Sequence, residues 1–215
     1  MKFLFETFAN NQNTSSVSSM LRKKRFALFI ETLSVKSSDR ILDVGGTEHT
    51  WNRSGLENRV TILNLKFERH DPRYSYICGD ACNMHMIKNK EFDIVFSNSV
   101  IEHVGQEKQK LFANEVLRVG IKYWIQTPYK HFPVESHFVF PFFQYLPKYV
   151  QRRIALKWPY SNYFYNGNRK EEILWELERL KLLTISEMKY LFQDSRIIYE
   201  KYFGIVKSII AYKSP

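Results

Sequence analysis

The chain carries the sequence Arg-Ile-Leu-Asp-Val-Gly-Gly at residues 40–46, an apolar segment that ends in an acid and two glycines. A second segment that ends in polar residues, Phe-Asp-Ile-Val-Phe-Ser-Asn-Ser-Val-Ile-Glu-His-Val, follows at residues 92–104. Glycine permits positive φ and has no Cβ, so the backbone of such a turn can approach a ligand closely. The two segments in this order predict a nucleotide-type cofactor held at the carboxyl edge of a parallel sheet.

Other short apolar runs extend this pattern. Strands are predicted at residues 41–44, 60–65, 74–78, 92–97 and 121–126. Apolar residues at helical spacing predict one helix from a Ser19 cap through residue 33, and a second at residues 105–119. Strands that alternate with helices are typical of a parallel sheet covered by helices.

The alternation breaks after Pro128. Residues 128–167 combine several prolines with many aromatic side chains. This segment is too long and too apolar for a plain loop, so we predict an ordered insertion. An amphipathic helix is predicted at residues 168–183.

The end of the chain has clear signals for a helix and a hairpin. Thr184-Ile-Ser-Glu187 is a capping-box pattern, which predicts a helix through Phe192. The runs 196–203 and 205–212 flank Gly204 and predict an antiparallel hairpin at the sheet edge.

These elements predict one domain over residues 19–215, preceded by a flexible arm at residues 1–18 that is rich in Asn, Gln and Ser. The predicted fold class is α/β. The expected architecture is a Rossmann-like, doubly wound, mostly parallel sheet with a C-terminal antiparallel hairpin and a helical, aromatic lid insertion at about residues 128–183.

Charge and cysteine content restrict the partners and the compartment. Lys and Arg outnumber Asp and Glu by 32 to 22, a formal charge of +10, which favours acidic partners without choosing among them. Cys78 and Cys82 fit neither a disulfide framework nor a zinc site, and we interpret them as reduced, buried thiols of a cytoplasmic protein.

The sequence predicts no membrane span, because no apolar run approaches the roughly 18 residues that a span requires. The aromatic segment 138–147 and the basic segment 148–158 have two interpretations. They form a hydrophobic lid over the sheet, which we favour, or they make a peripheral contact with an anionic membrane surface.

The sequence resembles the class I S-adenosylmethionine-dependent methyltransferases, in particular the methyltransferase type 11 group. Ile41–Thr47 is similar to the family's first motif, and Cys78–Ala81 to the acidic turn after its third strand. Phe92–Val104 is similar to the fourth-strand motif and is the most specific match. The resemblance covers roughly residues 20–213 and implies that S-adenosylmethionine is the cofactor.

The resemblance also implies roles for individual residues. The residues implied to hold the cofactor are Asp43, Gly45, Gly46, Thr47, Asn64, Asp80, Ala81, Ser97 and Asn98. Asp43 would lie beside the methionine part, Asp80 beside the adenine amine, and His103 near the transferred methyl group. The alternatives are that Asp43 only orders its loop, that Asp80 only caps a turn, and that His103 is structural.

Two positions depart from the family pattern. Thr47 stands where the family usually has glycine. The second strand ends in Asn64 where the family usually has the acid that binds the ribose hydroxyls, and Glu68 is nearby. Asparagine lacks the charge that strengthens such bonds, so weaker cofactor binding or a catalytically inactive fold is an alternative interpretation.

The start of the insertion offers groups for acid–base chemistry. His131, Glu135 and His137 follow the fifth predicted strand and, with His103, form the predicted catalytic set. A plain polar turn into the lid is the alternative. The His-x-x-x-Glu-x-His spacing is able to bind a metal, but no further ligand cluster is evident and we predict none.

The predicted function is S-adenosylmethionine-dependent O-methylation of a small-molecule, sugar or lipid-linked acceptor by in-line transfer. The first alternative is an inactive methyltransferase fold that serves as a binding or scaffold protein. The second, which we favour less, is a nucleic-acid methyltransferase. Ser97-Asn98-Ser99 lacks the Asn-Pro-Pro-Tyr-type sequence of enzymes that methylate base amino groups.

Overall fold

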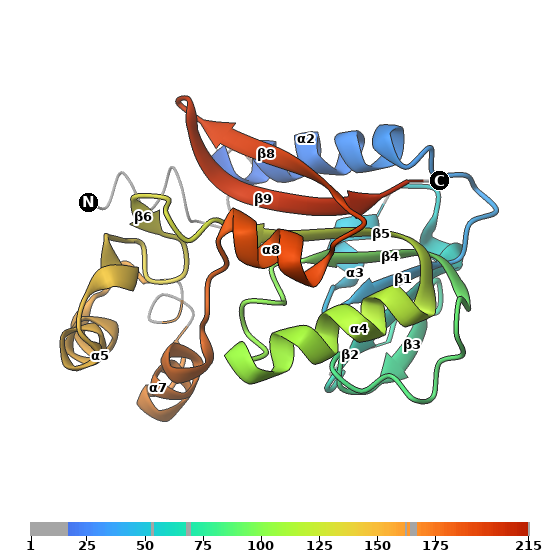
Figure 1. Cartoon of the computed structure of the whole chain (residues 1–215). Helices are drawn as coiled ribbons and strands as arrows, with labels where there is room; N and C mark the ends of the chain where they lie inside the picture. The colour runs from blue at the N-terminus through green and yellow to red at the C-terminus, as the bar shows by residue number, and fades with distance from the viewer. Residues whose placement is uncertain (1–16, 53, 68–69, 162, 164–166, 215) are drawn as a thin grey trace.

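The computed structural model describes residues 17–52, 54–67, 70–161, 163 and 167–214 (Figure 1). Residues 1–16 of the predicted N-terminal arm lie outside this part of the chain. Helix α2 spans Val17–Thr32. The prediction of a Ser19 cap is therefore wrong, because helical backbone already begins at Val17.

The centre of the fold is a seven-stranded sheet with the order β3-β2-β1-β4-β5-β9-β8. Its strands are β1 (Ile41–Val44), β2 (Val60–Asn64), β3 (Ser75–Cys78), β4 (Phe92–Asn98), β5 (Gly120–Pro128), β8 (Arg196–Tyr202) and β9 (Ile205–Lys213). The first five are parallel, whereas β9 runs antiparallel to both β5 and β8. The predicted fold class, with its parallel sheet and C-terminal hairpin, is confirmed.

Helices cover both faces of the sheet (Figure 1). On one face, α4 (Gln109–Val119) and α8 (Ile185–Leu191) contribute to a core with the inward side chains of the strands. On the other face, α2 and the single-turn helix α3 (Glu48–Trp51) contribute to a second core. Because the central strands are buried on both sides, their sequences are continuously apolar.

Short 3-10 segments precede two of these elements. The segment η1 (Glu57–Arg59) leads into β2, and η2 (Gln106–Lys108) leads into α4. Gly105 has φ +86°, a left-handed conformation that favours glycine, so the predicted helix at 105–119 starts as a 3-10 turn and becomes α-helical only at Gln109.

Both cysteines are free thiols, and Cys82 is buried as expected. Cys78 is exposed, so the prediction that both are buried is wrong. The cause is the position of β3, which is an edge strand of the sheet and therefore presents part of its length to solvent.

The insertion after β5 forms a small lobe at one end of the sheet, at the left in Figure 1. Its elements are β6 (Val134–Glu135), β7 (Phe140–Pro141), η3 (Phe143–Tyr145), α5 (Lys148–Lys157) and α7 (Lys170–Arg179). The lobe has a core of its own, made of Phe138, Phe143, Ala155, Ile173 and Leu177. None of the described helices has the length and apolar character needed to cross a membrane.

The capping box of α8 gives the first prediction. Thr184 Oγ1 accepts the Glu187 N–H at 3.2 Å, and the Glu187 carboxylate accepts the Thr184 N–H at 2.7 Å. We expect Thr184→Ala to lower the free energy of unfolding by about 1 kcal/mol, since one N–H of the first turn loses its acceptor. Urea denaturation measures this loss. Thr184→Ser keeps the hydroxyl and should lose much less; equal losses in both variants would contradict the cap.

Candidate active site

The carboxyl ends of β1 and β4 lie side by side at the point where the strand order reverses. Asp43 of β1 pairs with Phe96 of β4, and the Ser97 hydroxyl donates to the Val44 carbonyl at 3.1 Å. From here β2 continues the sheet on one side and β5 on the other. In open α/β sheets the crevice at such a point is where ligands bind.

Asp43 is buried at this point with half of its carboxylate unsatisfied. Its Oδ2 accepts a hydrogen bond from Trp51 Nε1 at 2.7 Å, whereas its Oδ1 is buried without a partner. Burial raises the pKa of Asp43 to about 7, although the hydrogen bond from Trp51 opposes the rise. A buried acceptor without a donor costs free energy, so this position favours a ligand that brings an N–H group.

The glycines after Asp43 leave no room for side chains. Gly45 has φ +72°, and a Cβ on Gly46 would lie 1.8 Å from Asp43 Oδ2. Asn64 at the end of β2 reaches the same loop, with its Nδ2 3.5 Å from the Gly46 carbonyl oxygen. Thr47 follows as an exposed residue. The structure thus gathers Asp43, both glycines and Asn64 into one cradle.

The remaining predicted cofactor residues have local partners. Asp80 accepts the Cys82 N–H at 2.9 Å and forms an ion pair with Lys108 at 3.6 Å, so it does cap its own turn. Ala81 packs against the core beside that turn. Asn98 accepts a hydrogen bond from the Arg25 guanidinium of α2 at 2.5 Å, which fixes the polar end of β4.

A second buried carboxylate, Glu102, lies in the turn after β4. Its Oε2 accepts the Thr127 hydroxyl at 3.0 Å, and its Oε1 is buried without a hydrogen-bond partner. Its carbonyl accepts the Lys181 N–H at 2.8 Å, which joins this turn to the end of the insertion. Glu102 was not among the predicted site residues.

Two histidines meet beside Glu102. The rings of His103 and His137 are 4.7 Å apart and nearly perpendicular. His103 Nδ1 bonds to Glu176 of α7 at 3.0 Å, and His137 Nδ1 bonds to Glu135 of β6 at 2.7 Å. Each ring therefore has a carboxylate on Nδ1, which leaves Nε2 for another partner. His137 Nε2 lies 3.9 Å from Glu102 Oε1.

The charges of this cluster shift its pKa values. Burial alone would lower the pKa of His137, but the carboxylates of Glu135, Glu102 and Glu176 outweigh it and the pKa is raised. Burial would raise the pKa of Glu135, but His137 and the N–H groups of His137 and Phe138 outweigh it and the pKa is lowered. The lowered pKa favours the carboxylate form of Glu135, and the raised pKa makes the neutral imidazole of His137 a stronger base.

The structure brings together three of the four predicted catalytic residues. His131 is apart from them: its Nδ1 bonds to the exposed Tyr145 hydroxyl at 2.5 Å. Across the residues that the structure describes, no hydrogen bond or ring contact links His131 to His103 or His137. The sequence missed Glu102 and Glu176. Glu102 stands next to His103 in the fourth-strand segment, whereas nothing local marked Glu176.

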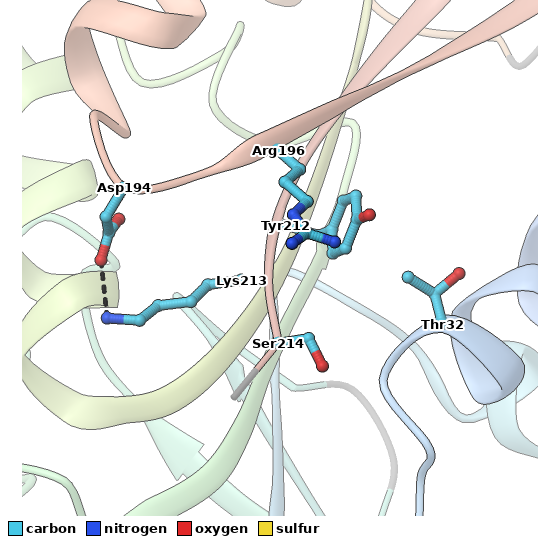
Figure 2. Close-up of a pocket in the computed structure, with 6 residues that line it drawn as sticks. All are labelled: Thr32, Asp194, Arg196, Tyr212, Lys213 and Ser214. Carbon is cyan, nitrogen blue, oxygen red and sulfur yellow. Dashed lines mark hydrogen bonds and ion pairs between the residues drawn. The ribbon is translucent and has the colours of Figure 1, made fainter.

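A surface pocket near the amino ends of the parallel strands is separate from this site (Figure 2). It is lined by Thr32, Asp194, Arg196, Tyr212, Lys213 and Ser214. Lys213 pairs with Tyr123 near the amino end of β5, whereas the candidate site lies at the carboxyl ends of the parallel strands. Asp194 and Lys213 already form an ion pair at 2.7 Å.

Part of the chain matches a known protein family. The family described as "Methyltransferase domain" matches residues 55–122, from just before β2 into β5. Among curated proteins, none matches the chain.

Three solved structures share the fold. A candidate methyltransferase from an antibiotic biosynthesis pathway of Anabaena variabilis is 16% identical with a TM-score of 0.53, over 83% of this chain and 64% of that one, so this chain spans less than two thirds of its length. A candidate zinc-dependent alcohol dehydrogenase of Rhodobacter sphaeroides is 12% identical with a TM-score of 0.56, over 89% of each chain. The 1,6-didemethyltoxoflavin-N1-methyltransferase of Burkholderia thailandensis is 14% identical with a TM-score of 0.53, over 92% of this chain and 80% of that one.

Identities this low show the fold alone, and the fold is shared with a protein of another described activity. The methyltransferase-domain match includes the specific fourth-strand segment and supports methyl transfer over the other activity for residues 55–122. Residues 55–122 match a methyltransferase domain, and the fold is that of the class I S-adenosylmethionine-dependent methyltransferases.

The residues of the cradle fit S-adenosylmethionine. The bare Asp43 Oδ1 offers an acceptor to the cofactor's ammonium group. A Cβ on Gly45 or Gly46 would collide with a neighbouring side chain. With glycine at both positions, the backbone of this loop is able to approach the cofactor. Asn64 lies beside the same loop without the charge of an acid; its Nδ2 is 3.5 Å from the Gly46 carbonyl oxygen, and its Oδ1 accepts the Leu65 N–H at 3.0 Å.

The raised pKa of Asp43 predicts a pH-dependent stability. The folded protein keeps the Asp43 proton up to about pH 7, whereas the unfolded chain loses it near its ordinary value of 3.8. The stability that this proton confers is complete below pH 3.8 and is lost as the pH rises through 7. We expect wild type to lose up to about 1.4 kcal/mol per pH unit relative to Asp43→Asn between pH 5 and pH 7. Urea denaturation at several pH values tests this; parallel curves would contradict it.

Proposed function

We propose that this methyltransferase transfers the methyl group to a hydroxyl oxygen of a small-molecule, sugar or lipid-linked acceptor, bound beside His103 and His137. The observation that carries the proposal is the pair of imidazoles whose Nδ1 atoms are both held by carboxylates. A hydroxyl must lose its proton during transfer, whereas a carboxylate acceptor already lacks one. Imidazole is the side chain best suited to take such a proton near neutral pH.

The two halves of the proposed site have different tasks. When bound, the cofactor supplies a methyl group activated on a sulfonium. Asp43 and the glycine loop hold the methionine part, and Ser97 and Asn98 line the end of β4 beneath the methyl group. The turn that follows β4 then carries Glu102 and His103 to the acceptor side.

The insertion serves, in this proposal, as a lid that excludes water from the acceptor. It is tied to the β4 turn, because Arg179 Nε donates to the His103 carbonyl at 3.2 Å and the Lys181 N–H donates to the Glu102 carbonyl. Its helices α5 and α7 pack on one another, with an ion pair between Arg152 and Glu178 at 2.9 Å. Excluding water strengthens electrostatic interactions within such a site.

A lipid-linked acceptor is supported by the outer surface of the insertion. Phe142, Tyr145 and Tyr149 are all more than half exposed, at 57%, 52% and 66%. Arg153 is exposed on the same helix as Tyr149. Aromatic and basic side chains together suit a peripheral contact with anionic lipid, through residues 138–158.

The names of similar structures support a small acceptor. The Burkholderia thailandensis structure contains 1,6-didemethyltoxoflavin, and a Haemonchus contortus structure with a TM-score of 0.51 contains phosphomonomethylethanolamine. Both proteins are named N-methyltransferases. An assay of the proposed transfer to oxygen therefore has to compare each alcohol with the corresponding amine.

We expect His137→Ala to lower turnover about 100-fold or more, because the acceptor's proton loses its partner, while affinity for S-adenosylhomocysteine stays unchanged. Transfer of radiolabelled methyl from S-adenosylmethionine to matched alcohols, phenols, sugars and amines measures turnover, and calorimetry measures affinity. The exposed His85→Ala is the matched control. Wild-type turnover in His137→Ala, or methylation of amines alone, would count against the proposal.

A further inference from the structure

We propose that Glu102, His103 and His137 bind a divalent first-row cation, such as Zn²⁺, which holds the acceptor hydroxyl. The inference rests on the proposed O-methylation and names the group that activates the hydroxyl. One ligand atom from each of these residues lies within 4.8 Å of the other two. Around a cation with bonds of about 2.0–2.2 Å, ligand atoms lie roughly 3–4 Å apart, so small side-chain rotations complete the site.

The first support is the bare oxygen of Glu102. The residue is fully buried, its Oε2 is taken by Thr127, and its Oε1 has no hydrogen-bond partner. A buried carboxylate oxygen in this state is costly, and native proteins rarely leave one unsatisfied. Its close neighbour is His137 Nε2 at 3.9 Å, a distance that suits two ligands of one cation.

The second support is the way both histidines are held. Glu176 accepts from His103 Nδ1, and Glu135 accepts from His137 Nδ1. Carboxylates on the far nitrogen of metal-binding histidines fix the tautomer and ring orientation and make Nε2 a better ligand. Two independent histidines in this arrangement, from the β4 turn and from the insertion, meet at one buried carboxylate.

The donor set indicates the kind of ion and its task. Two imidazoles and one carboxylate favour a first-row cation over Mg²⁺ or Ca²⁺, which prefer oxygen ligands. Three protein ligands leave a coordination position open, which is typical of catalytic and not of structural sites. An acceptor hydroxyl in that position would have a lowered pKa: its proton would pass to water as the acceptor binds, before the lid excludes solvent, and the electron pair of the O–H bond would stay on oxygen. With the cation bound, the histidines serve as its ligands, and activation of the hydroxyl by the cation replaces the direct proton transfer to imidazole described above.

Calorimetry tests the site directly. The full chain is treated with EDTA, dialysed and titrated with Zn²⁺ or Co²⁺ alone. We expect saturable binding at a single site, weakened at least about tenfold in His103→Ala, in His137→Ala and in the near-isosteric Glu102→Gln. Visible absorption of bound Co²⁺ reports the ligands and should change in the same variants. His85→Ala should match wild type.

Affinity for S-adenosylhomocysteine, measured in each variant, shows whether the fold persists. With that affinity intact, the absence of saturable binding, or binding that the three substitutions leave unchanged, would overturn the cation site. Full transfer to alcohols by EDTA-treated protein, lost in His137→Ala, would also overturn it while the proposed O-methylation stands. Transfer to amines alone would overturn the O-methylation, independently of the cation measured by calorimetry.

Discussion

The buried carboxylate of Glu102 is the contact on which the proposed acceptor site depends. It accepts a hydrogen bond from Thr127 of β5, and its own carbonyl is bonded to Lys181 at the end of the insertion. It also faces His137, which the insertion supplies. A polar group buried in this way is stable only while its partners are present. In the proposed function, the acceptor site is therefore complete only while the insertion packs against the turn after β4.

Asp43 repeats this arrangement on the cofactor side. Each of the two acids is buried with one oxygen satisfied by the protein and the other bare. For stability alone, an apolar residue would be better at either position, because a buried oxygen without a hydrogen-bond donor lowers the free energy of unfolding. Proteins break such local rules mainly at functional sites. In the two proposals above, the unpaired oxygen of Asp43 faces the cofactor and that of Glu102 faces the cation on the acceptor side.

The sequence predicted the elements that depend on neighbouring residues, and it missed the contacts in the site between residues that are distant along the chain. The strands, the hairpin and the Thr184 capping box follow from local periodicity and spacing. The cradle at Asp43 and Gly46 was predictable because one short segment forms it. Glu176 was not, because its contact with His103 requires the insertion to fold back onto the β4 turn. Sequence spacing likewise grouped His131 with His137, whereas the structure separates them.

The end of β4 joins the two halves of the site. Asn98 is held by Arg25 of α2, whose guanidinium also forms an ion pair with Glu200 of the hairpin at 2.6 Å. The next residue, Ser99, has φ +58°, and its N–H and hydroxyl both bond to Gln126 of β5 at 3.0 Å. A non-glycine residue in this conformation persists only where surrounding contacts fix it. In the proposed site, only a few residues of this turn lie between the cofactor side and the acceptor side. Displacement of α2 or of the insertion would therefore disturb the cofactor side and the acceptor side together.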